Sequence, residues 1–190
     1  MIVDAHLDLA YNALSYGRDL LLPLAQLRGR EGVDAVRGRA TVTFPALREA
    51  NVGLVFGTIF GSPATSGKMS DLPQAATYRN ADEAHKQGQL QLDYYHRLVE
   101  AQEQLHLVGS IADLDYAIAN DKTGIVVLME GADPIRTPDE LELWHERGLR
   151  LVGLAWDDTR YSFGAWRNGS GGLTKHGHAL LEKMAEYGSI

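Results

Sequence analysis

Two side chains near the N-terminus, His6 and Asp8, are of types that bind metal ions. They follow the apolar start of a predicted strand over residues 2–8, in the segment MIVDAHLDLA. Residues i and i+2 of a strand point to the same face, so an imidazole and a carboxylate are expected side by side. Both groups are good ligands for zinc or a similar divalent ion. The plainer alternative is a strand end whose histidine and aspartate bond to nearby backbone.

A third candidate ligand, Glu130, ends the apolar run TGIVVLME at residues 123–130. This run is typical of a strand buried on both faces of a parallel sheet. Functional side chains of parallel α/β proteins gather at the carboxyl ends of the strands, so Glu130 is expected at the same edge as His6 and Asp8. The alternative is that Glu130 is simply the first polar residue beyond a buried strand.

A fourth predicted strand, over residues 149–156, ends in Trp156 and is followed by Asp157-Asp158-Thr159-Arg160-Tyr161. Trp156, Asp157 and Tyr161 are candidates for substrate contact, and the loop over 156–168 is expected to form part of a substrate wall. Asp158 and Arg160 are interpreted as ordinary charges of a solvent-exposed loop.

The elements that must position these residues alternate between strand and helix. Besides the strands already given, residues 51–60 predict a strand, and 17–39 and 61–73 are interpreted as a connecting excursion and a loop. Helices are predicted over 44–50, over about 74–104, over 111–120 with Ser110 as N-cap, over a segment opening with a capping box at Thr137 and Glu140, and over 173–187. Alternation of this kind predicts an α/β protein with a parallel sheet. Four strands in 190 residues correspond to about the first half of a (β/α)8 TIM-type barrel, which needs eight strands and roughly 250 residues. We therefore expect residues 1–190 to form the N-terminal part of a single barrel.

Composition excludes several classes of protein. The chain has no cysteine, so a metal must be held by histidine, aspartate or glutamate. A net charge of −7 argues against nucleic-acid binding. No apolar run is long enough to cross a membrane and no signal peptide is recognisable, so a cytoplasmic protein is expected. The remaining histidines lack metal-ligand spacing and are interpreted as surface or structural: His85, His96, His106, His145, His176 and His178.

Taken together, the motifs resemble the membrane (renal) dipeptidase family of amidohydrolase-like metallo-barrels. The resemblance rests on DAHLDL at 4–9, MEGADP at 129–134, GLRLVGL at 148–154 and a glycine-leucine pattern over 172–184. It implies a zinc-dependent dipeptidase with two zinc ions, in which His6 and Asp8 bind one ion and Glu130 bridges both. It also implies that a hydroxide held between the metals attacks the peptide carbonyl of a dipeptide.

The chain departs from the family pattern in two ways. The second zinc needs two histidines from later strands, and an aspartate and an arginine that contact substrate come later still, so one zinc or none is expected here. Where the family commonly has Leu-Thr-His, this chain reads Leu154-Ala155-Trp156. Open sheet edges lead us to expect a homo-oligomer or a complementing C-terminal half. The alternatives are a catalytically inactive half-barrel that acts through association, and another amidohydrolase such as a lactonase or deaminase, although those relatives often use a lysine where Glu130 stands.

Overall fold

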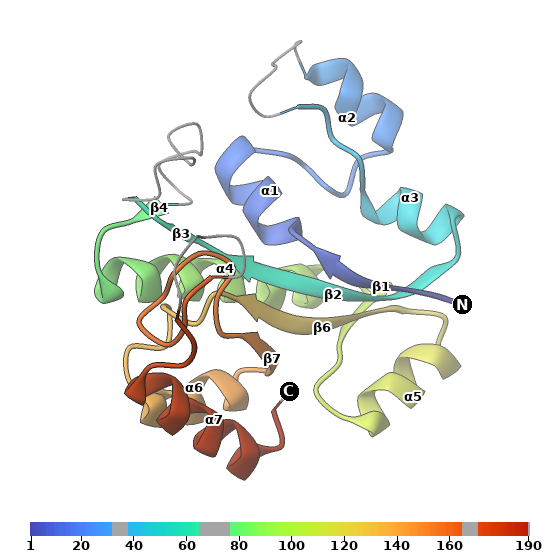
Figure 1. The fold of residues 1–190 in the computed structure, drawn as a ribbon. Helices are drawn as coiled ribbons and strands as arrows, with labels where there is room; N and C mark the ends of the chain where they lie inside the picture. Colours follow the sequence, from blue (N-terminus) through green and yellow to red (C-terminus); the bar gives the residue numbers. More distant parts are fainter. Residues whose placement is uncertain (32–37, 65–76, 165–170, 190) are drawn as a thin grey trace.

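A parallel β-sheet organises the chain in the computed structural model, which describes residues 1–31, 38–64, 77–164 and 171–189. The main sheet has five strands, and β6 lies at its centre (Figure 1). One side of β6 pairs with β2, which pairs in turn with β1; the other side pairs with β5 at its start and with β7 at its end. The strands are β1 (Ile2–Leu7), β2 (Val52–Phe60), β5 (Leu105–Leu107), β6 (Thr123–Glu130) and β7 (Leu149–Gly153).

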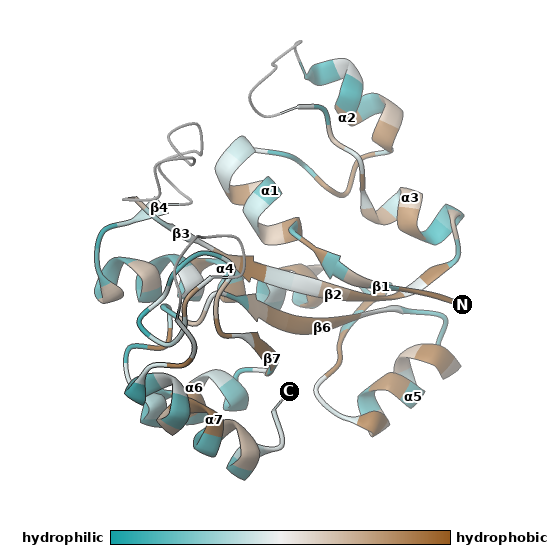
Figure 2. Cartoon of the chain, viewed as in Figure 1, coloured by the Kyte–Doolittle hydropathy of each residue, from teal (hydrophilic) through white to brown (hydrophobic). Residues whose placement is uncertain are grey.

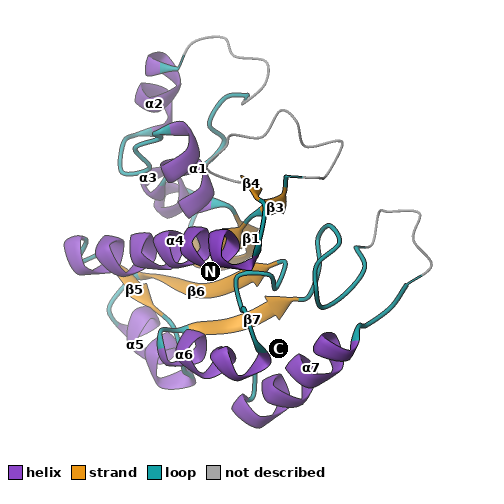
Figure 3. Ribbon diagram, turned by 90° about the vertical axis from the view of Figure 1, so that its left-hand side faces the viewer, coloured by secondary structure: helices purple, strands orange, loops and turns teal. Residues whose placement is uncertain are grey.

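Helices occupy the connections between these strands. The helix α4 runs alongside the sheet, while α6 and α7 lie together near β7 (Figure 3). A second, two-stranded parallel sheet follows the end of β2 and consists of β3 (Ser62–Pro63) and β4 (Thr77–Tyr78). The helices are α1 (Leu9–Tyr16), α2 (Leu24–Arg30), α3 (Phe44–Glu49), α4 (Ala81–Ala101), α5 (Ile111–Ala119), α6 (Leu141–Glu146), preceded by the 3-10 turn η2 (Pro138–Glu140), and α7 (Lys175–Tyr187).

The two faces of the sheet bury different amounts of apolar side chain. Alternate residues of β2 and β6, such as Val55 and Val127, belong to a large core shared with the helices that includes Tyr95 and Trp144. The opposite face carries a smaller cluster built around Leu54, Val108 and Val126. Both central strands are apolar over most of their length, as Figure 2 shows, because each contributes to a cluster on either face.

The predicted parallel α/β sheet is confirmed, and β6 has the bounds that the sequence predicted. One predicted strand has a different end in the structure, and one strand was not predicted. The fourth strand ends at Gly153 rather than at residue 156, because Leu154 already takes part in the turn contact with Ala132. The short strand β5 was missed, since three residues are too few for alternation to register, and His106 lies in it rather than at a helix end.

Helix boundaries were predicted well where side-chain caps are unambiguous. Ser110 caps α5 by accepting a hydrogen bond from the N–H of Asp113, and α7 ends at Gly188 in the left-handed conformation. The long helix begins only at Ala81, because residues 77–78 form β4; residues 74–76 lie outside the described part. The predicted capping box was wrong: the Thr137 side chain makes no cap bond in this structure.

No helix within the described residues is both long and apolar enough to span a membrane. The predicted loops over 61–73 and 156–168, and the excursion over 17–39, fall partly outside the described residues. Within the excursion, the structure adds the helix α2.

Candidate metal centre

His6, Asp8 and Glu130 converge at the carboxyl edge of the sheet. His6 belongs to β1, Asp8 follows β1 directly at the start of α1, and Glu130 ends β6. One possible ligand atom from each of these side chains lies within 4.8 Å of those of the other two. The parallel pairing of β1, β2 and β6 brings these strand ends together across a separation of more than 120 residues.

A local irregularity in β1 accompanies this arrangement. Asp4 pairs with Val55 and Leu7 pairs with Gly57, so three steps along β1 match two steps along β2. The extra residue falls in the stretch that contains His6. Such a bulge bends the strand and re-aims a side chain, a device often found beside functional sites.

The spacing of His6 and Glu130 fits two ligands of one divalent ion. The His6 Nε2 and Glu130 Oε2 atoms are 3.1 Å apart. Two ligands held about 2.0–2.1 Å from a tetrahedral zinc lie roughly 3.3 Å from each other, so this pair already has the required spacing. The three candidate ligand atoms together lie within 4.8 Å of one another, which is wider than that spacing.

The state of Asp8 also fits a cation ligand. Among the described residues its Oδ1 atom is buried without a hydrogen-bond partner, and its side chain does not cap α1 although it stands at the N-cap position. Burial raises the pKa of Asp8, the imidazole of His6 partly offsets this, and the neighbouring Glu130 carboxylate raises the pKa further. Two carboxylates close together in a partly buried place favour either a proton or a cation between them.

Trp156 belongs to a group of aromatic side chains at the carboxyl edge of the sheet. Its ring meets that of Phe60 edge-on at a centroid distance of 5.2 Å, and Phe60 in turn meets Tyr11 at 5.5 Å. Phe60 is the residue of β2 paired with Glu130. The three rings therefore form an aromatic row beside the ligand cluster.

Asp157 and Tyr161 are both buried, and each forms a hydrogen bond with another residue of the chain. An oxygen of Asp157 accepts the N–H of Asp158, and the hydroxyl of Tyr161 donates to the carbonyl of Ile135. These bonds shape the loop that follows β7. A contact of either residue with substrate stays a prediction.

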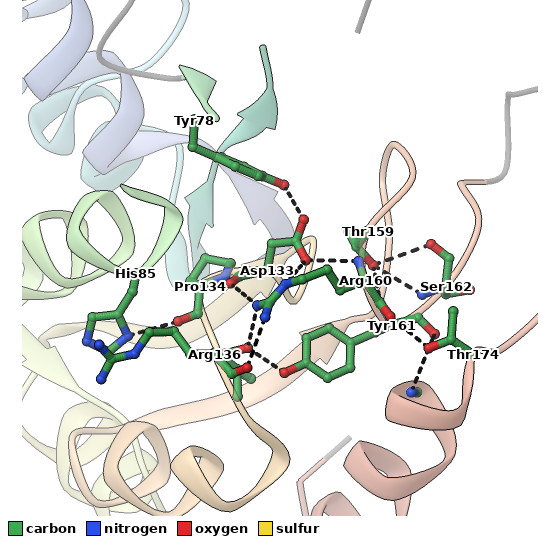
Figure 4. A network of polar contacts seen from close by, with 12 residues as sticks. Tyr78, His85, Asp133, Pro134, Arg136, Thr159, Arg160, Tyr161, Ser162 and Thr174 are labelled. Carbon is green, nitrogen blue, oxygen red and sulfur yellow. Dashed lines mark hydrogen bonds and ion pairs between the residues drawn. The ribbon is translucent and has the colours of Figure 1, made fainter. Parts of the chain in front are cut away.

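Arg160 is exposed, as expected for a charge of the loop, and it also has a structural role. Its guanidinium donates to the carboxylate of Asp133 at 3.1 Å and to the carbonyls of Asp133, Ile135 and Arg136 (Figure 4). The turn that follows Glu130 therefore wraps around one side chain. A charged residue after a strand carries no sequence signal for this role, because its partners lie 24 to 27 residues away.

Further polar contacts join that turn to its surroundings. The hydroxyl of Tyr78 in β4 donates to Asp133 at 2.8 Å, and Thr174, the N-cap of α7, donates to the carbonyl of Arg160 at 2.7 Å. His85 contacts the carbonyl of Pro134 at 3.0 Å through Nδ1. The network thus holds β4, the β6 turn, the β7 loop and α7 in one arrangement around the edge of the sheet (Figure 4).

A parallel α/β sheet with an imidazole and two carboxylates at its carboxyl edge is what a part of a metal-binding α/β barrel would present. The family model for membrane dipeptidase, peptidase family M19, matches residues 1–190. The chain belongs to this family, which confirms the resemblance noted in its motifs.

Individual relatives cover the chain unequally. An uncharacterized protein in the PQQ-III 3′ region of Acinetobacter calcoaceticus is 31% identical over 103 residues, which is 50% of this chain and 33% of that protein. Two solved structures match all of this chain with a TM-score of 0.73: the dipeptidase AC, a metallo peptidase of family M19, at 20% identity, and a metallo peptidase from Rhodobacter sphaeroides bound to a phosphinate mimic of the dipeptide L-Ala-D-Ala, at 17% identity. The chain spans 56% and 57% of those two chains, so it corresponds in fold to about half of each.

Proposed function

We propose that this chain carries the first metal-binding half of a zinc-dependent dipeptidase site. His6 and Asp8 would bind one ion, and Glu130 would be the shared ligand and catalytic carboxylate. The observation that carries the proposal is the convergence of these three side chains within 4.8 Å at one edge of the sheet, in a member of the M19 family.

The chemistry of the three groups supports this assignment. When bound, a divalent cation supplies Lewis acidity toward a peptide carbonyl and makes water a stronger nucleophile. His6 and Asp8 hold their ligand atoms in place through β1 and the start of α1. Glu130 meets His6 through Oε2, which leaves Oε1 for a second ion or for a proton taken from water.

On the substrate side we assign Trp156, Asp157 and Tyr161 to the binding wall. The indole of Trp156 offers a flat apolar face and one N–H donor, where an imidazole would offer a group that can be charged. Asp157 and Tyr161 are buried, so they would support this wall from within the loop after β7. A dipeptide is the substrate class that membership of the family favours.

Three ligands are enough for one ion, and a binuclear site needs further ligands. We propose that these come from another polypeptide segment, either a complementing C-terminal half or a second copy of this chain. The cytoplasmic location inferred from the sequence remains part of the proposal.

Zinc stoichiometry and affinity test the metal assignment. We expect His6→Ala and Glu130→Gln each to weaken zinc binding by more than about a hundredfold, because the first removes a ligand and the second removes a ligand's negative charge, and loss of outer contacts alone weakens binding by about 10- to 100-fold. The matched controls are His178→Ala and Glu182→Gln, which alter exposed residues of α7. Equal zinc binding by all four variants and the unaltered protein would refute the assignment. Near two zincs per chain, with dipeptide turnover abolished by Glu130→Gln, would establish the complete site.

A specific observation also favours the second candidate, a catalytically inactive half-barrel that acts through association. Within the described residues β1 pairs only with β2, and its apolar side chains Ile2 and Val3 are 55% and 49% exposed. An open strand edge of this kind is a surface for pairing. Monodisperse dimers that bind zinc at less than one per five chains and hydrolyse no dipeptide would support this candidate over the enzyme.

A further inference from the structure

A buried ion pair is linked by two successive hydrogen bonds, through Asn12, to the backbone carbonyl of Asp8. The Arg18 Nε atom is 2.6 Å from Glu31 Oε1, and the two side chains are only 7% and 9% exposed. Burying two charges costs several kcal/mol of desolvation per ion, and a well-packed apolar pair is often as stable or more so. The presence of this pair therefore calls for a role other than stability.

The pair fixes the chain on both sides of it. Arg18 follows α1 and Glu31 follows α2. Arg18 donates through Nη2 to the carbonyl of Gly38 at 2.9 Å, and the second oxygen of Glu31 accepts the N–H of Ala40 at 2.7 Å. The guanidinium also stands 5.0 Å from the ring centroid of Tyr16. These contacts leave the guanidinium little freedom to move.

Asn12 connects this fixed guanidinium to the metal cluster. Arg18 donates to the side-chain oxygen of Asn12, which turns the amide nitrogen of Asn12 toward Asp8. That nitrogen donates to the carbonyl of Asp8 at 2.7 Å, and the backbone N–H of Asn12 donates to the same carbonyl at 3.0 Å. Two donors on one carbonyl restrict the backbone rotation that decides where the Asp8 side chain points.

We propose that Arg18, acting through Asn12, is a positioning residue for Asp8. It holds the backbone of Asp8 from behind, so that the carboxylate stays beside His6 and Glu130 instead of turning back to cap α1. This inference rests on the proposed function, in which the three side chains bind a divalent cation. Outer contacts of this kind typically change metal affinity by 10- to 100-fold.

Replacing the ion pair with apolar side chains tests the positioning role. We expect Arg18→Met/Glu31→Leu to weaken Co²⁺ binding by 10- to 100-fold in folded protein, while the loss of the hydrogen bonds to Gly38 and Ala40 lowers the melting temperature. Co²⁺ serves as the probe because its visible absorption reports the ligand geometry directly. Asn12→Ala, which keeps the ion pair, should weaken Co²⁺ binding by a similar factor. The matched control is Arg48→Met/Asp121→Leu, which removes an exposed ion pair and should leave binding unchanged.

Each outcome decides between the possibilities. Weaker Co²⁺ binding with an altered spectrum in both variants, measured where each is fully folded, supports the proposal. Unaltered affinity and spectrum in the double variant or in Asn12→Ala overturn the positioning role and leave the metal site intact. If the double variant does not fold, Asn12→Ala alone decides in the same way. Absence of Co²⁺ binding by the unaltered protein overturns the proposed metal site, and the positioning role with it.

Discussion

Asp133→Ala is the substitution that most directly tests the network around the turn after Glu130. The Asp133 carboxylate accepts the Tyr78 hydroxyl at 2.8 Å, the backbone N–H of Arg160 at 2.9 Å and the Arg160 Nε–H at 3.1 Å. Alanine removes all three acceptor contacts. It leaves a buried tyrosine hydroxyl without a partner and a cationic side chain without its counter-ion.

The expected loss follows from the exposure of each partner. Hydrogen bonds to a charged group contribute about 1.5–3 kcal/mol each. The Arg160 side chain is 39% exposed, so the solvent screens its ion pair and its share is discounted. We expect Asp133→Ala to lower the free energy of unfolding by about 3 kcal/mol. Asp133→Asn keeps the shape and one acceptor oxygen and should lower it by about 1 kcal/mol.

Urea denaturation followed by circular dichroism and by tryptophan fluorescence measures the effect. Coincidence of the two transitions checks that unfolding is two-state. The matched controls are Asp82→Ala and Asp139→Ala, whose exposed ion pairs with Arg136 and Lys183 should contribute less than about 0.5 kcal/mol. If the free energy of unfolding of Asp133→Ala differs by less than about 0.5 kcal/mol from that of the unaltered protein, the network contributes little to stability and our reasoning is wrong.

Two further predictions concern packing and pH. Gly57→Ala would place a methyl group 2.8 Å from the ring of Tyr95 and should destabilise the protein by about 1–3 kcal/mol. At Gly29 in α2 an added methyl group meets no described atom within 4 Å outside its chain neighbours and its own helix backbone, so Gly29→Ala should stabilise the protein by about 0.5–1 kcal/mol. Melting curves of the two variants should shift in opposite directions, and equal shifts would contradict the packing argument. Burial by itself would raise the pKa of Glu140, but the hydrogen bonds from Arg136 lower this pKa below its usual value. The ionised Glu140 therefore stabilises the folded protein fully above about pH 4.3, and this stabilisation is lost as the pH falls through the lowered pKa. Urea midpoints measured from pH 7 to pH 3 should therefore fall less steeply for Glu140→Gln, and parallel curves would rule out this contribution.

Much of the fold could be predicted from short-range pattern. The apolar run at 123–130 predicted β6 with the correct bounds because a strand buried on both faces has a distinctive composition. Ser110 and Gly188 marked helix ends because a side-chain cap and a left-handed turn are local requirements. The strand β5 and the 3-10 turn before α6 escaped prediction, because short elements are decided by their neighbours rather than by periodicity.

The candidate site divides in the same way. His6 and Asp8 were recognisable because both side chains can bind a metal ion and because they are only two positions apart in the sequence. Glu130 was recognisable because it is an acid at the end of an apolar strand. Arg18 and Arg160 carried no signal, since the significance of each depends on partners that only folding brings near.

The sequence by itself determined the residue types, the strand–helix alternation and the family, because all of these are written in local order and composition. The tertiary structure decided which distant groups meet. Parallel pairing through β2 placed the Glu130 Oε2 atom 3.1 Å from the His6 Nε2 atom, and folding brought Glu31 to Arg18, whose guanidinium contacts Asn12. Register and burial arise from the packing of the whole sheet and its helices, so no short segment contains them.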